Sequence, residues 1–492
     1  MPDQEAVSRE SQPGPRWPAY RRVRELETLY SGASALRPVG TAPRVAVVGA
    51  GLAGLAAAHL LARGGCKPLV FEASARLGGR IRTDREELAP NMVSELGGEF
   101  VDSAHADMIA LARYFGCTPI DTGLRSEANL HTAFRYGGRI YTDQQESEAF
   151  APFAARIRAD AARLSARVTR ARHSATDERF DKMSIDEYLD HIGMSGWLRA
   201  RISGGYAALN GLDGAEQSSI NLLDQIGTDP ATGMELNAKS DERWKVAEGL
   251  DRLIEGLAGG LPVPPQREHC LARIRRTGDA VTLDFTTPGG TASVVADAVV
   301  LALPFTLLRQ VDTAGVFSPH KQYAIDHLAY GTNSKVLVGT RRPVWREQGF
   351  AGELYTDGLA QSGWDSSRLR GGGQNVYTFF LGGRRGLECG EGSLQHTARQ
   401  LAGEAEKSWP GFSAALNGRM ARVHWPSEPW ALASYSTYGV GQRTGLAGEE
   451  QRPEGGIYFA GEHCSASWQG YMQGAAATGR TAATQILRQW AG

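Results

Sequence analysis

Long apolar runs are missing from this chain of 492 residues. No stretch reaches the roughly 18 to 20 consecutive apolar residues that a membrane-spanning helix needs. The sequence begins with charged and polar residues (MPDQEAVSRE), where a secretory signal peptide would have an apolar core. Arg21-Arg22 is followed by ELETLY rather than by an apolar run, which argues against a twin-arginine signal. We therefore expect no membrane partner and a cytoplasmic location.

Cysteine is scarce and scattered along the chain. The number of cysteines is odd and no two of them form a CxxC pair, which argues against a disulfide framework and against a zinc site. We therefore expect no metal, and a reducing compartment fits the pattern. The five cysteines are Cys66, Cys117, Cys270, Cys389 and Cys464.

Neither sign of charge is in excess. The 53 Lys and Arg residues nearly balance the 54 Asp and Glu residues, so the formal net charge is −1. Nucleic-acid-binding proteins normally carry a basic surplus on one face, and we therefore expect no nucleic-acid partner. The length exceeds the size at which a single hydrophobic core keeps growing, which predicts two domains.

A βαβ pattern follows the polar stretch at residues 1–41. Residues 44–49 (RVAVVG) form a short β-branched run, typical of a strand that is buried on both faces of a parallel sheet. Residues 52–63 are rich in Ala and Leu and predict a helix, and residues 68–73 (PLVFEA) predict the next strand. The turn between the first strand and the helix carries the GxGxxG spacing of Gly49, Gly51 and Gly54.

The glycine turn and the acid after it predict a dinucleotide site. Gly49 permits the tight turn, Gly51 lets the backbone approach a pyrophosphate, and Gly54 lets the helix pack closely on the strand. The helix N-terminus then presents free N–H groups to the phosphates. Glu72 ends the second strand, where a carboxylate can accept a hydrogen bond from an adenosine ribose hydroxyl, and this favours FAD or NAD over NADP. The motif alone does not separate FAD from NAD.

Beyond this unit the sequence alternates between helix and strand patterns. Residues from about 104 to 200 predict a helical insert, and residues 270–303 carry turn signals that predict hairpin strands. Two strand-like segments, SKVLVGT and NVYTFFLGG, precede a helix near residues 393–407. The chain closes with the strand IYFAGEH and an Ala-rich helix at residues 471–489.

Four blocks of the sequence resemble the flavin-containing amine oxidases, a family that includes monoamine, polyamine and L-amino acid oxidases. The resemblance implies FAD as the cofactor, oxygen as a co-substrate and, as in many relatives, a homodimer. It also implies an α/β and α+β fold, in which an FAD-binding Rossmann-like domain of the glutathione-reductase type is interleaved with a mixed-sheet substrate domain and a helical insert. The blocks are VAVVGAGLAGLAAA to GGRIRT, ELGGEFVD, YGTNSKVLVG and IYFAGEHCSASWQGYMQGA.

The resemblance implies discontinuous domains. Residues 1–41 are an N-terminal extension. The FAD-binding domain takes residues 42–118, 240–323 and 424–490, and the substrate-binding domain with its helical insert takes residues 119–239 and 324–423.

The resemblance also assigns cofactor-binding roles. The segment with Arg76, Gly78, Gly79 and Arg80 is similar to the family segment that lies along the pyrophosphate and the flavin. Gly461 and Glu462 match the family position at which an acid binds the ribityl chain of the flavin, and the backbone at Leu271 matches the position that meets the adenine ring. Ser434 stands where monoamine oxidases carry a cysteine linked to the flavin, so noncovalent FAD is expected.

Catalytic roles follow from the same resemblance. Lys335 is similar to a family lysine that points inward and holds a water against flavin N5. Tyr435 and Tyr471 match two aromatic positions that flank the substrate nitrogen. In amino acid oxidases the backbone carbonyl at the position of Gly470 accepts a hydrogen bond from the substrate amino group.

The first hypothesis is oxidative deamination of an L-amino acid, with hydride transfer to flavin N5. A substrate carboxylate requires a fixed arginine. The amino acid oxidases carry that arginine just after the strand where this chain has GGEF, so Arg125, Arg135 or Tyr377 would have to take its place.

The second hypothesis is a monoamine or polyamine oxidase, in which Glu99 could receive a distal ammonium group. A flavin amino acid monooxygenase, a desaturase and a noncatalytic flavin protein are further alternatives. Lys335 and the block around Tyr471 argue against the desaturase.

Overall fold

Buried apolar runs from both ends of the chain build one parallel sheet. The computed structural model describes residues 15–32, 42–230, 232–370 and 373–490. The strand order is β18-β12-β1-β2, and every residue of the first three strands is buried, as their continuous apolar sequences predict. The strands are β1 (Val45–Val48), β2 (Leu69–Phe71), β12 (Ala298–Leu301) and β18 (Ile457–Phe459).

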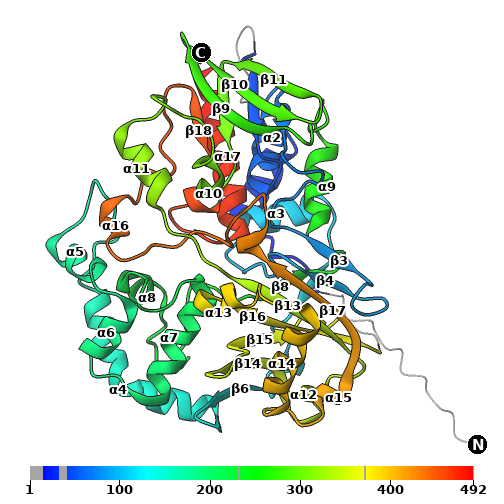
Figure 1. The fold of residues 1–492 in the computed structure, drawn as a ribbon, viewed down its shortest axis with the longest axis vertical. Coiled ribbons are helices and arrows are strands. Elements are labelled where there is room, and N and C mark those ends of the chain that lie inside the picture. The colour runs from blue at the N-terminus through cyan, green and yellow to red at the C-terminus, as the bar shows by residue number, and fades with distance from the viewer. Residues whose placement is uncertain (1–14, 33–41, 231, 371–372, 491–492) are drawn as a thin grey trace, which may run out of the picture.

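Two helices distant in sequence pack on each other beside this sheet. Helix α2 (Leu52–Arg63) begins at the glycine turn, and α17 (Met472–Gln489) closes the chain. Both helices are rich in Ala and Gly, which allows a close approach: a Cβ added at Gly479 would lie 2.2 Å from the carbonyl oxygen of Ala53. Figure 1 shows the two helices side by side in the upper part of the molecule.

An antiparallel sheet of three strands lies next to the parallel sheet. It consists of β9 (Cys270–Thr277), β10 (Ala280–Thr287) and β11 (Gly290–Ala296), which agree with the predicted hairpins. The last strand of that prediction differs, because β12 pairs in parallel with β1 and β18. Its sequence AVVL is wholly apolar, and only a sheet covered on both faces buries such a strand completely.

A mixed sheet of seven strands fills the other half of the molecule. Its order is β17-β13-β16-β15-β14-β6-β7, and all seven residues of β13 are buried. Its core includes a cluster of aromatic rings from Trp345, Tyr377, Trp409 and Phe412. The strands are β6 (His131–Tyr136), β7 (Arg139–Tyr141), β13 (Ser334–Thr340), β14 (Phe350–Thr356), β15 (Ser362–Asp365), β16 (Asn375–Leu381) and β17 (Leu416–His424).

The predicted helical stretch starts as expected with α3 (Ala106–Tyr114), but strands interrupt it before the helices of the insert. Residues 119–141 contain strands β5 (Pro119–Asp121), β6 and β7 rather than α-helix, because β6 finds a parallel partner in the distant β14. Three helices then start at capping boxes whose first residues are Thr142, Ser174 and Ser184. In Figure 1 these helices lie beside the seven-stranded sheet. The helices of the insert are α4 (Asp143–Ala161), α5 (Ala175–Asp181), α6 (Ile185–His191), α7 (Gly196–Asn210) and α8 (Ser219–Gln225).

The remaining elements are short and connect the sheets. Two small antiparallel pairs, β3 with β4 and β5 with β8, lie between the parallel sheet and the seven-stranded sheet. The pairs add β3 (Thr83–Arg85), β4 (Val93–Glu95) and β8 (Trp244–Val246), and the connecting helices are α3 (Ala106–Tyr114), α9 (Asp251–Gly259), α10 (Phe305–Leu308), α11 (Pro319–His327), α12 (Val344–Glu347), α13 (Gly383–Glu388), α14 (Leu394–Glu406), α15 (Phe412–Ala415) and α16 (Gln442–Gly445).

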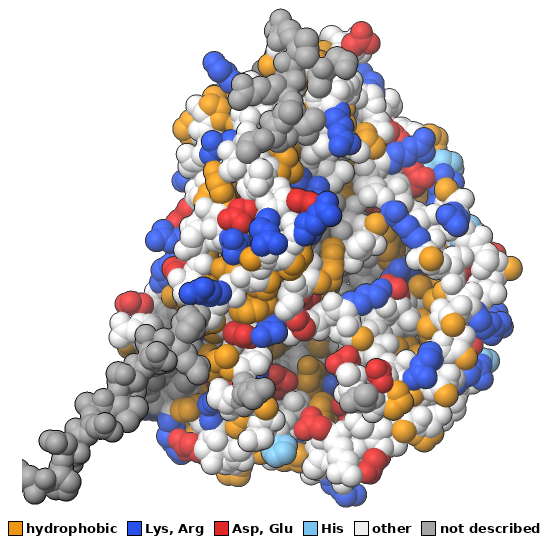
Figure 2. Space-filling model, turned by 180° about the vertical axis from the view of Figure 1, so that it is seen from behind, with side chains coloured by type: hydrophobic (Ala, Val, Ile, Leu, Met, Phe, Trp, Pro, Cys, Tyr) orange, Lys and Arg blue, Asp and Glu red, His pale blue; other side chains and the backbone are white. Residues whose placement is uncertain are grey.

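Charged side chains of both signs are spread over the surface. On the face shown in Figure 2, Lys and Arg side chains alternate with Asp and Glu side chains. Among the described residues, no helix combines the length and the apolar character that a membrane crossing requires. The cytoplasmic location and the homodimer stay predictions.

The described part of the N-terminal extension includes a helix that packs on the body of the protein. Helix α1 (Arg21–Tyr30) buries Val23, Leu26 and Tyr30 against α3 and α2. The Tyr30 hydroxyl donates a hydrogen bond of 3.0 Å to Asp107, which also pairs with Arg480 of α17. The extension therefore contributes to the same hydrophobic core as the parallel sheet.

Truncation of the buried face of α1 should destabilise the protein. Leu26→Ala removes a side chain that is only 1% exposed, and we expect the free energy of unfolding to fall by about 2 to 5 kcal/mol. Thr28→Ala on the exposed face is the matched control and should change it by less than about 0.5 kcal/mol. Thermal unfolding of both variants measures the difference, and equal midpoints would contradict the assigned packing of α1.

Candidate active site

A cavity of about 2030 Å³ lies where the parallel sheet, the seven-stranded sheet and the helical insert meet. Its wall includes the glycine turn after β1, the loop after β4, Lys335 on β13 and the segment after β18. The volume exceeds the roughly 300 to 1,000 Å³ of a site for a drug-sized ligand. The cavity therefore has room for a dinucleotide together with a second small molecule.

The glycine turn has the geometry of a phosphate-binding turn. Gly49 has φ of 100°, and a Cβ there would lie 2.6 Å from the carbonyl oxygen of Ala302. A Cβ at Gly54 would lie 1.9 Å from the carbonyl oxygen of Gly49, so any side chain would push α2 away from the strand. A Cβ at Gly51 would meet no atom closer than 3.9 Å. The open side of the turn is thus at Gly51, where a pyrophosphate would approach.

Glu72 is held rigidly at the end of β2. Its two carboxylate oxygens accept hydrogen bonds from the backbone N–H groups of Ala50 (2.8 Å) and Ser74 (2.9 Å). Each oxygen retains a lone pair. Because Glu72 also lines the cavity, it can accept a ribose hydroxyl as the sequence predicts.

The two arginines after β2 have different surroundings. Arg76 donates to the carbonyl oxygens of Leu77, Gly79 and Ile81 and so fixes its own loop, and burial lowers the pKa of its guanidinium. Arg80 reaches instead to the end of the chain, where it pairs with Glu462 at 2.9 Å. It also donates to the carbonyl oxygen of Ser434.

Glu462 joins three segments around the cavity. Its carboxylate accepts hydrogen bonds from Arg80, from the backbone N–H and hydroxyl of Ser436, and from the backbone N–H of Gly470. Burial acts to raise the pKa of this carboxyl, but Arg80 and the hydrogen bonds hold the pKa below its usual value. Glu462 is therefore an anion that orders the loops next to it, and its role toward a ribityl chain stays a prediction.

The other predicted cofactor residues line the same cavity. Leu271 lies at the start of β9, and Gly461, with φ of 152°, lies two residues after the end of β18. The Ser434 hydroxyl donates to Asn333 at 2.7 Å, so this position holds a hydrogen-bonded hydroxyl and no thiol. FAD fits these residues for three reasons. The turn is open at Gly51, the acids Glu72 and Glu462 are buried at the cavity wall, and the cavity is large enough for a dinucleotide.

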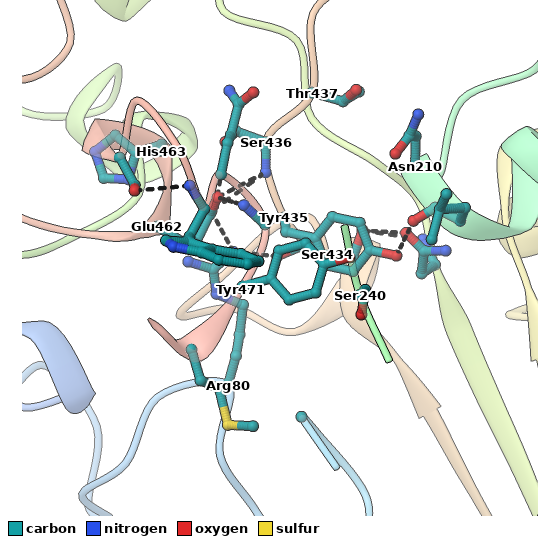
Figure 3. Close-up of a pocket in the computed structure, with 18 of the residues that line it drawn as sticks. Arg80, Asn210, Ser240, Ser434, Tyr435, Ser436, Thr437, Glu462, His463 and Tyr471 are labelled. Atoms are coloured by element: carbon teal, nitrogen blue, oxygen red, sulfur yellow. Dashed lines mark hydrogen bonds and ion pairs between the residues drawn. The ribbon is translucent and has the colours of Figure 1, made fainter. Parts of the chain in front are cut away.

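Tyr435 and Tyr471 lie together at the centre of the site. Figure 3 shows both rings between Glu462 on one side and Asn210 on the other. The Tyr435 hydroxyl donates to the carbonyl oxygen of Leu209 at 2.5 Å, and the Tyr471 hydroxyl accepts from Asn237 at 2.6 Å. Because the hydroxyls are engaged, the ring faces are the parts left for a ligand.

Gly470 packs against the ring of Tyr435. Its φ is 84°, and a Cβ at this position would lie 3.4 Å from the ring of Tyr435. The backbone N–H of Gly470 donates to Glu462 at 2.9 Å, which fixes the turn that precedes Tyr471. A role of its carbonyl oxygen toward substrate stays a prediction.

Lys335 points inward, as the resemblance implies. Its side chain is 4% exposed although it lies on a strand where alternation would allow exposure. The ammonium donates to the carbonyl oxygens of Glu95 (3.0 Å) and Gly97 (2.9 Å) and to the Glu99 carboxylate (3.0 Å). These acceptors use all three donors of an ammonium. The predicted water against the flavin would need one of these donors, and it stays a prediction.

Lys245 is a site residue that the sequence reading missed. It lies on β8, is 1% exposed and donates to the other oxygen of Glu99 at 2.7 Å. Glu99 is therefore not a solvated carboxylate and is not free to receive a substrate ammonium. The stretch DERWKV does not indicate that Lys245 is buried, because its partner Glu99 is 146 residues away in the sequence.

Glu242 is the second missed residue. Its side chain is exposed to the cavity, and the described part of the structure offers its carboxylate neither a hydrogen bond nor an ion pair. Desolvation first, and then Asp102, Glu353 and Glu99, raise the pKa of Glu242 to about 8. Its backbone has φ of 41°, a conformation that costs a non-glycine residue about 1 to 3 kcal/mol and is common at functional sites.

Two of the three residues predicted to replace the missing carboxylate-binding arginine, Tyr377 and Arg135, are not brought into the cavity. Tyr377 lies in the aromatic core of the seven-stranded sheet and is fully buried. Arg135 on β6 is absent from the described residues that line the cavity. The side chain of Arg125 lies outside the described part of the structure.

Comparisons with known proteins give a consistent picture. A family model for flavin containing amine oxidoreductases matches residues 52–487. An L-amino acid dehydrogenase of Synechocystis sp. is 25% identical, with 90% of this chain and 94% of that protein covered, and a flavin-containing amine oxidase of Danio rerio is 23% identical over 90% and 85%.

A solved structure supports the fold. Cyclohexylamine oxidase from Brevibacterium oxydans superposes with a TM-score of 0.80 at 21% identity, over 91% of this chain and 99% of that one. This likeness confirms the predicted fold class.

A side chain added at the open glycine should block the cofactor without unfolding the protein. Gly51 has an extended backbone and free space at its Cβ, so Gly51→Val should keep the midpoint of thermal unfolding of the apoprotein and lose bound FAD. Gly259→Ala in α9, where a Cβ also meets nothing, is the control that should retain FAD. Visible absorbance of the purified variants gives the FAD content, and full yellow colour in Gly51→Val would refute this placement of the pyrophosphate.

Proposed function

Because the chain belongs to the family of flavin-containing amine oxidoreductases, we propose that it oxidises a primary amine that carries no carboxylate beside the reacting carbon. Family membership makes it an FAD-dependent enzyme of oxidative deamination, and we propose a small-molecule amine and oxygen as its reactants. Noncovalent FAD would be held by the glycine turn, Glu72, Arg80 and Glu462. Our proposal concerns the class of amine that the enzyme accepts.

The chain's own residues bind and orient the amine. The faces of Tyr435 and Tyr471 attract the amine nitrogen and exclude bulk water from it. Burial, together with Glu242, raises the pKa of both hydroxyls, so neither tyrosine acts as a base near neutral pH. When bound, FAD supplies a two-electron acceptor for the hydride at N5, and oxygen takes these electrons to give hydrogen peroxide. The imine product then hydrolyses to a carbonyl compound and ammonia.

The charges around the cavity carry the proposal. Four cations on the side of the seven-stranded sheet and the helical insert already pair with carboxylates, whereas the described residues offer the carboxylate of Glu242 no such partner. To bind a substrate carboxylate, any of these four cations would have to give up an existing ion pair, whereas a second ammonium group would find Glu242 available. The pairs are Arg201 with Glu146, Lys239 with Asp224, Arg243 with Asp121 and Arg368 with Glu127.

Oxidation of an L-amino acid is the second candidate. The relative from Synechocystis sp. is named an L-amino acid dehydrogenase and is similar over nearly the whole length of both chains. In this case Arg368 would bind the substrate carboxylate after release of its 3.3 Å contact with Glu353. The two candidates differ in whether that arginine is required.

A substrate panel separates these candidates. Peroxide and ammonia release should be measured with the L-amino acids, with tyramine and with putrescine at equal concentrations. We expect turnover of the carboxylate-free amines at least about tenfold above that of any L-amino acid, which corresponds to about 1.4 kcal/mol. Preference for an L-amino acid would instead support the second candidate, and oxygen uptake without peroxide, with an amide product, would indicate a monooxygenase.

The pH dependence tests the role of Glu242. Alkyl ammonium groups titrate near pH 10, so the distal ammonium of putrescine stays charged, while Glu242 gains its negative charge as the pH rises through about 8. The ratio of kcat/KM for putrescine to kcat/KM for n-butylamine should therefore rise by about tenfold from pH 6.5 to 9, the equivalent of about 1.4 kcal/mol. The ratio removes the pH dependence of the reacting amino group and of the enzyme groups that affect both amines equally.

Two variants complete this experiment. Glu242→Gln keeps the size of the side chain and removes its charge, so the ratio should lose its pH dependence. Asp241→Asn removes a neighbouring charge that already accepts a hydrogen bond from Ser103, and the pH dependence should persist. An unchanged pH profile in Glu242→Gln would rule out Glu242 as the site of the second cation.

A further inference from the structure

Three buried charges form a row beside the glycines of the loop after β4. Lys245, Glu99 and Lys335 are linked by ion pairs of 2.7 Å and 3.0 Å, one to each oxygen of the Glu99 carboxylate. The exposed fractions of the residues Lys245, Glu99 and Lys335 are 1%, 5% and 4%. All three line the cavity that fits FAD. With each group ionised, the row carries a net charge of +1.

The surroundings of the row favour the ionised form of the Glu99 carboxylate. The indole N–H of Trp364 donates to Glu99 at 3.1 Å, and the ring lies 5.2 Å from the Lys335 ammonium. Lys245 also donates to the carbonyl oxygen of Ser366 at 2.6 Å. Burial acts to raise the pKa of Glu99, but the two lysines lower it to about 2. The carboxylate is therefore negative throughout the pH range of a folded enzyme.

This row limits what Lys335 can do. Its three N–H groups are taken by Glu95, Gly97 and Glu99, so the ammonium acts on its surroundings through its charge. The nearest opposite charge is Glu99, which reduces the positive field of Lys335 in the cavity. Lys245 pairs with the same carboxylate and offsets part of that reduction.

We infer that Glu99 is a positioning residue that holds the Lys335 ammonium in place and sets, together with Lys245, the positive charge that the chain presents to the flavin. A positive charge near the flavin stabilises the electron-rich reduced ring. The charge of the row is therefore a determinant of the flavin reduction potential. This inference rests on the proposed position of the reactive edge of the flavin beside Lys335, but not on the identity of the amine.

Two single variants shift the charge of the row in opposite directions. Glu99→Gln is nearly isosteric and changes the net charge from +1 to +2, whereas Lys245→Met changes it to 0. The double variant restores +1. A purely structural role would lower FAD content or the midpoint of thermal unfolding in all three variants, without an ordered effect of opposite signs on the flavin.

The test uses holoenzyme at pH 6.5 and needs no amine. Two measurements are made: the dissociation constant of sulfite, an anion that reacts with oxidised flavin, and the midpoint potential against a reference dye. We expect sulfite to bind about tenfold more tightly to Glu99→Gln and about tenfold more weakly to Lys245→Met, with the double variant within about twofold of the native protein. A tenfold change in the equilibrium of a two-electron couple corresponds to about 30 mV.

The opposite signs decide the outcome. Shifts in the same direction for Glu99→Gln and Lys245→Met, or no shift in either one, would overturn the inference. Lys335→Met separates this failure from failure of the proposed flavin position: if it leaves sulfite affinity unchanged, Lys335 does not lie beside the flavin at all. If Glu99→Gln does not bind FAD, Lys245→Met and Lys335→Met must both weaken sulfite binding. If Lys245→Met does not bind FAD, Glu99→Gln must strengthen sulfite binding and Lys335→Met must weaken it.

Discussion

The ion pair between Arg80 and Glu462 is the contact on which the site depends. It joins side chains that are 382 residues apart in sequence and fixes the end of the chain against the segment that follows β2. The same Glu462 carboxylate holds Ser436 and Gly470, which adjoin Tyr435 and Tyr471. One buried anion therefore orders both the segment that follows β2 and the turns that adjoin the two aromatic rings in the cavity.

Local features of the sequence were sufficient to predict those parts of the site whose geometry is set by neighbouring residues. Gly49 and Gly54 have no room for a side chain because strand and helix meet within a few residues, and this constraint is visible in the spacing alone. Lys335, in contrast, was identified by resemblance, because a lysine on a strand would otherwise be expected in solvent.

Features that depend on distant partners were missed. Residues 119–141 contain strands because β6 pairs with β14, more than 200 residues later, and no local pattern shows this. Lys245 is buried only because Glu99 is buried opposite to it, and Glu242 acquires its raised pKa from desolvation and from acids on other segments. Pairing of charges across the fold is thus the property that single-sequence reasoning recovers least.

Buried ion pairs often contribute little to the stability of a fold, because the cost of desolvation often exceeds the gain from pairing. This chain nevertheless buries Lys245, Glu99 and Lys335 in contact with one another, and desolvation raises the pKa of the neighbouring Glu95 to about 7. An apolar cluster of the same volume would hold the fold at least as well. The position of these charges on the wall of the cavity, rather than within a hydrophobic core, indicates that they act on what the cavity contains. The same reasoning applies to Glu242, whose carboxylate has no ion pair within the described residues and lines the cavity in which the amine would bind.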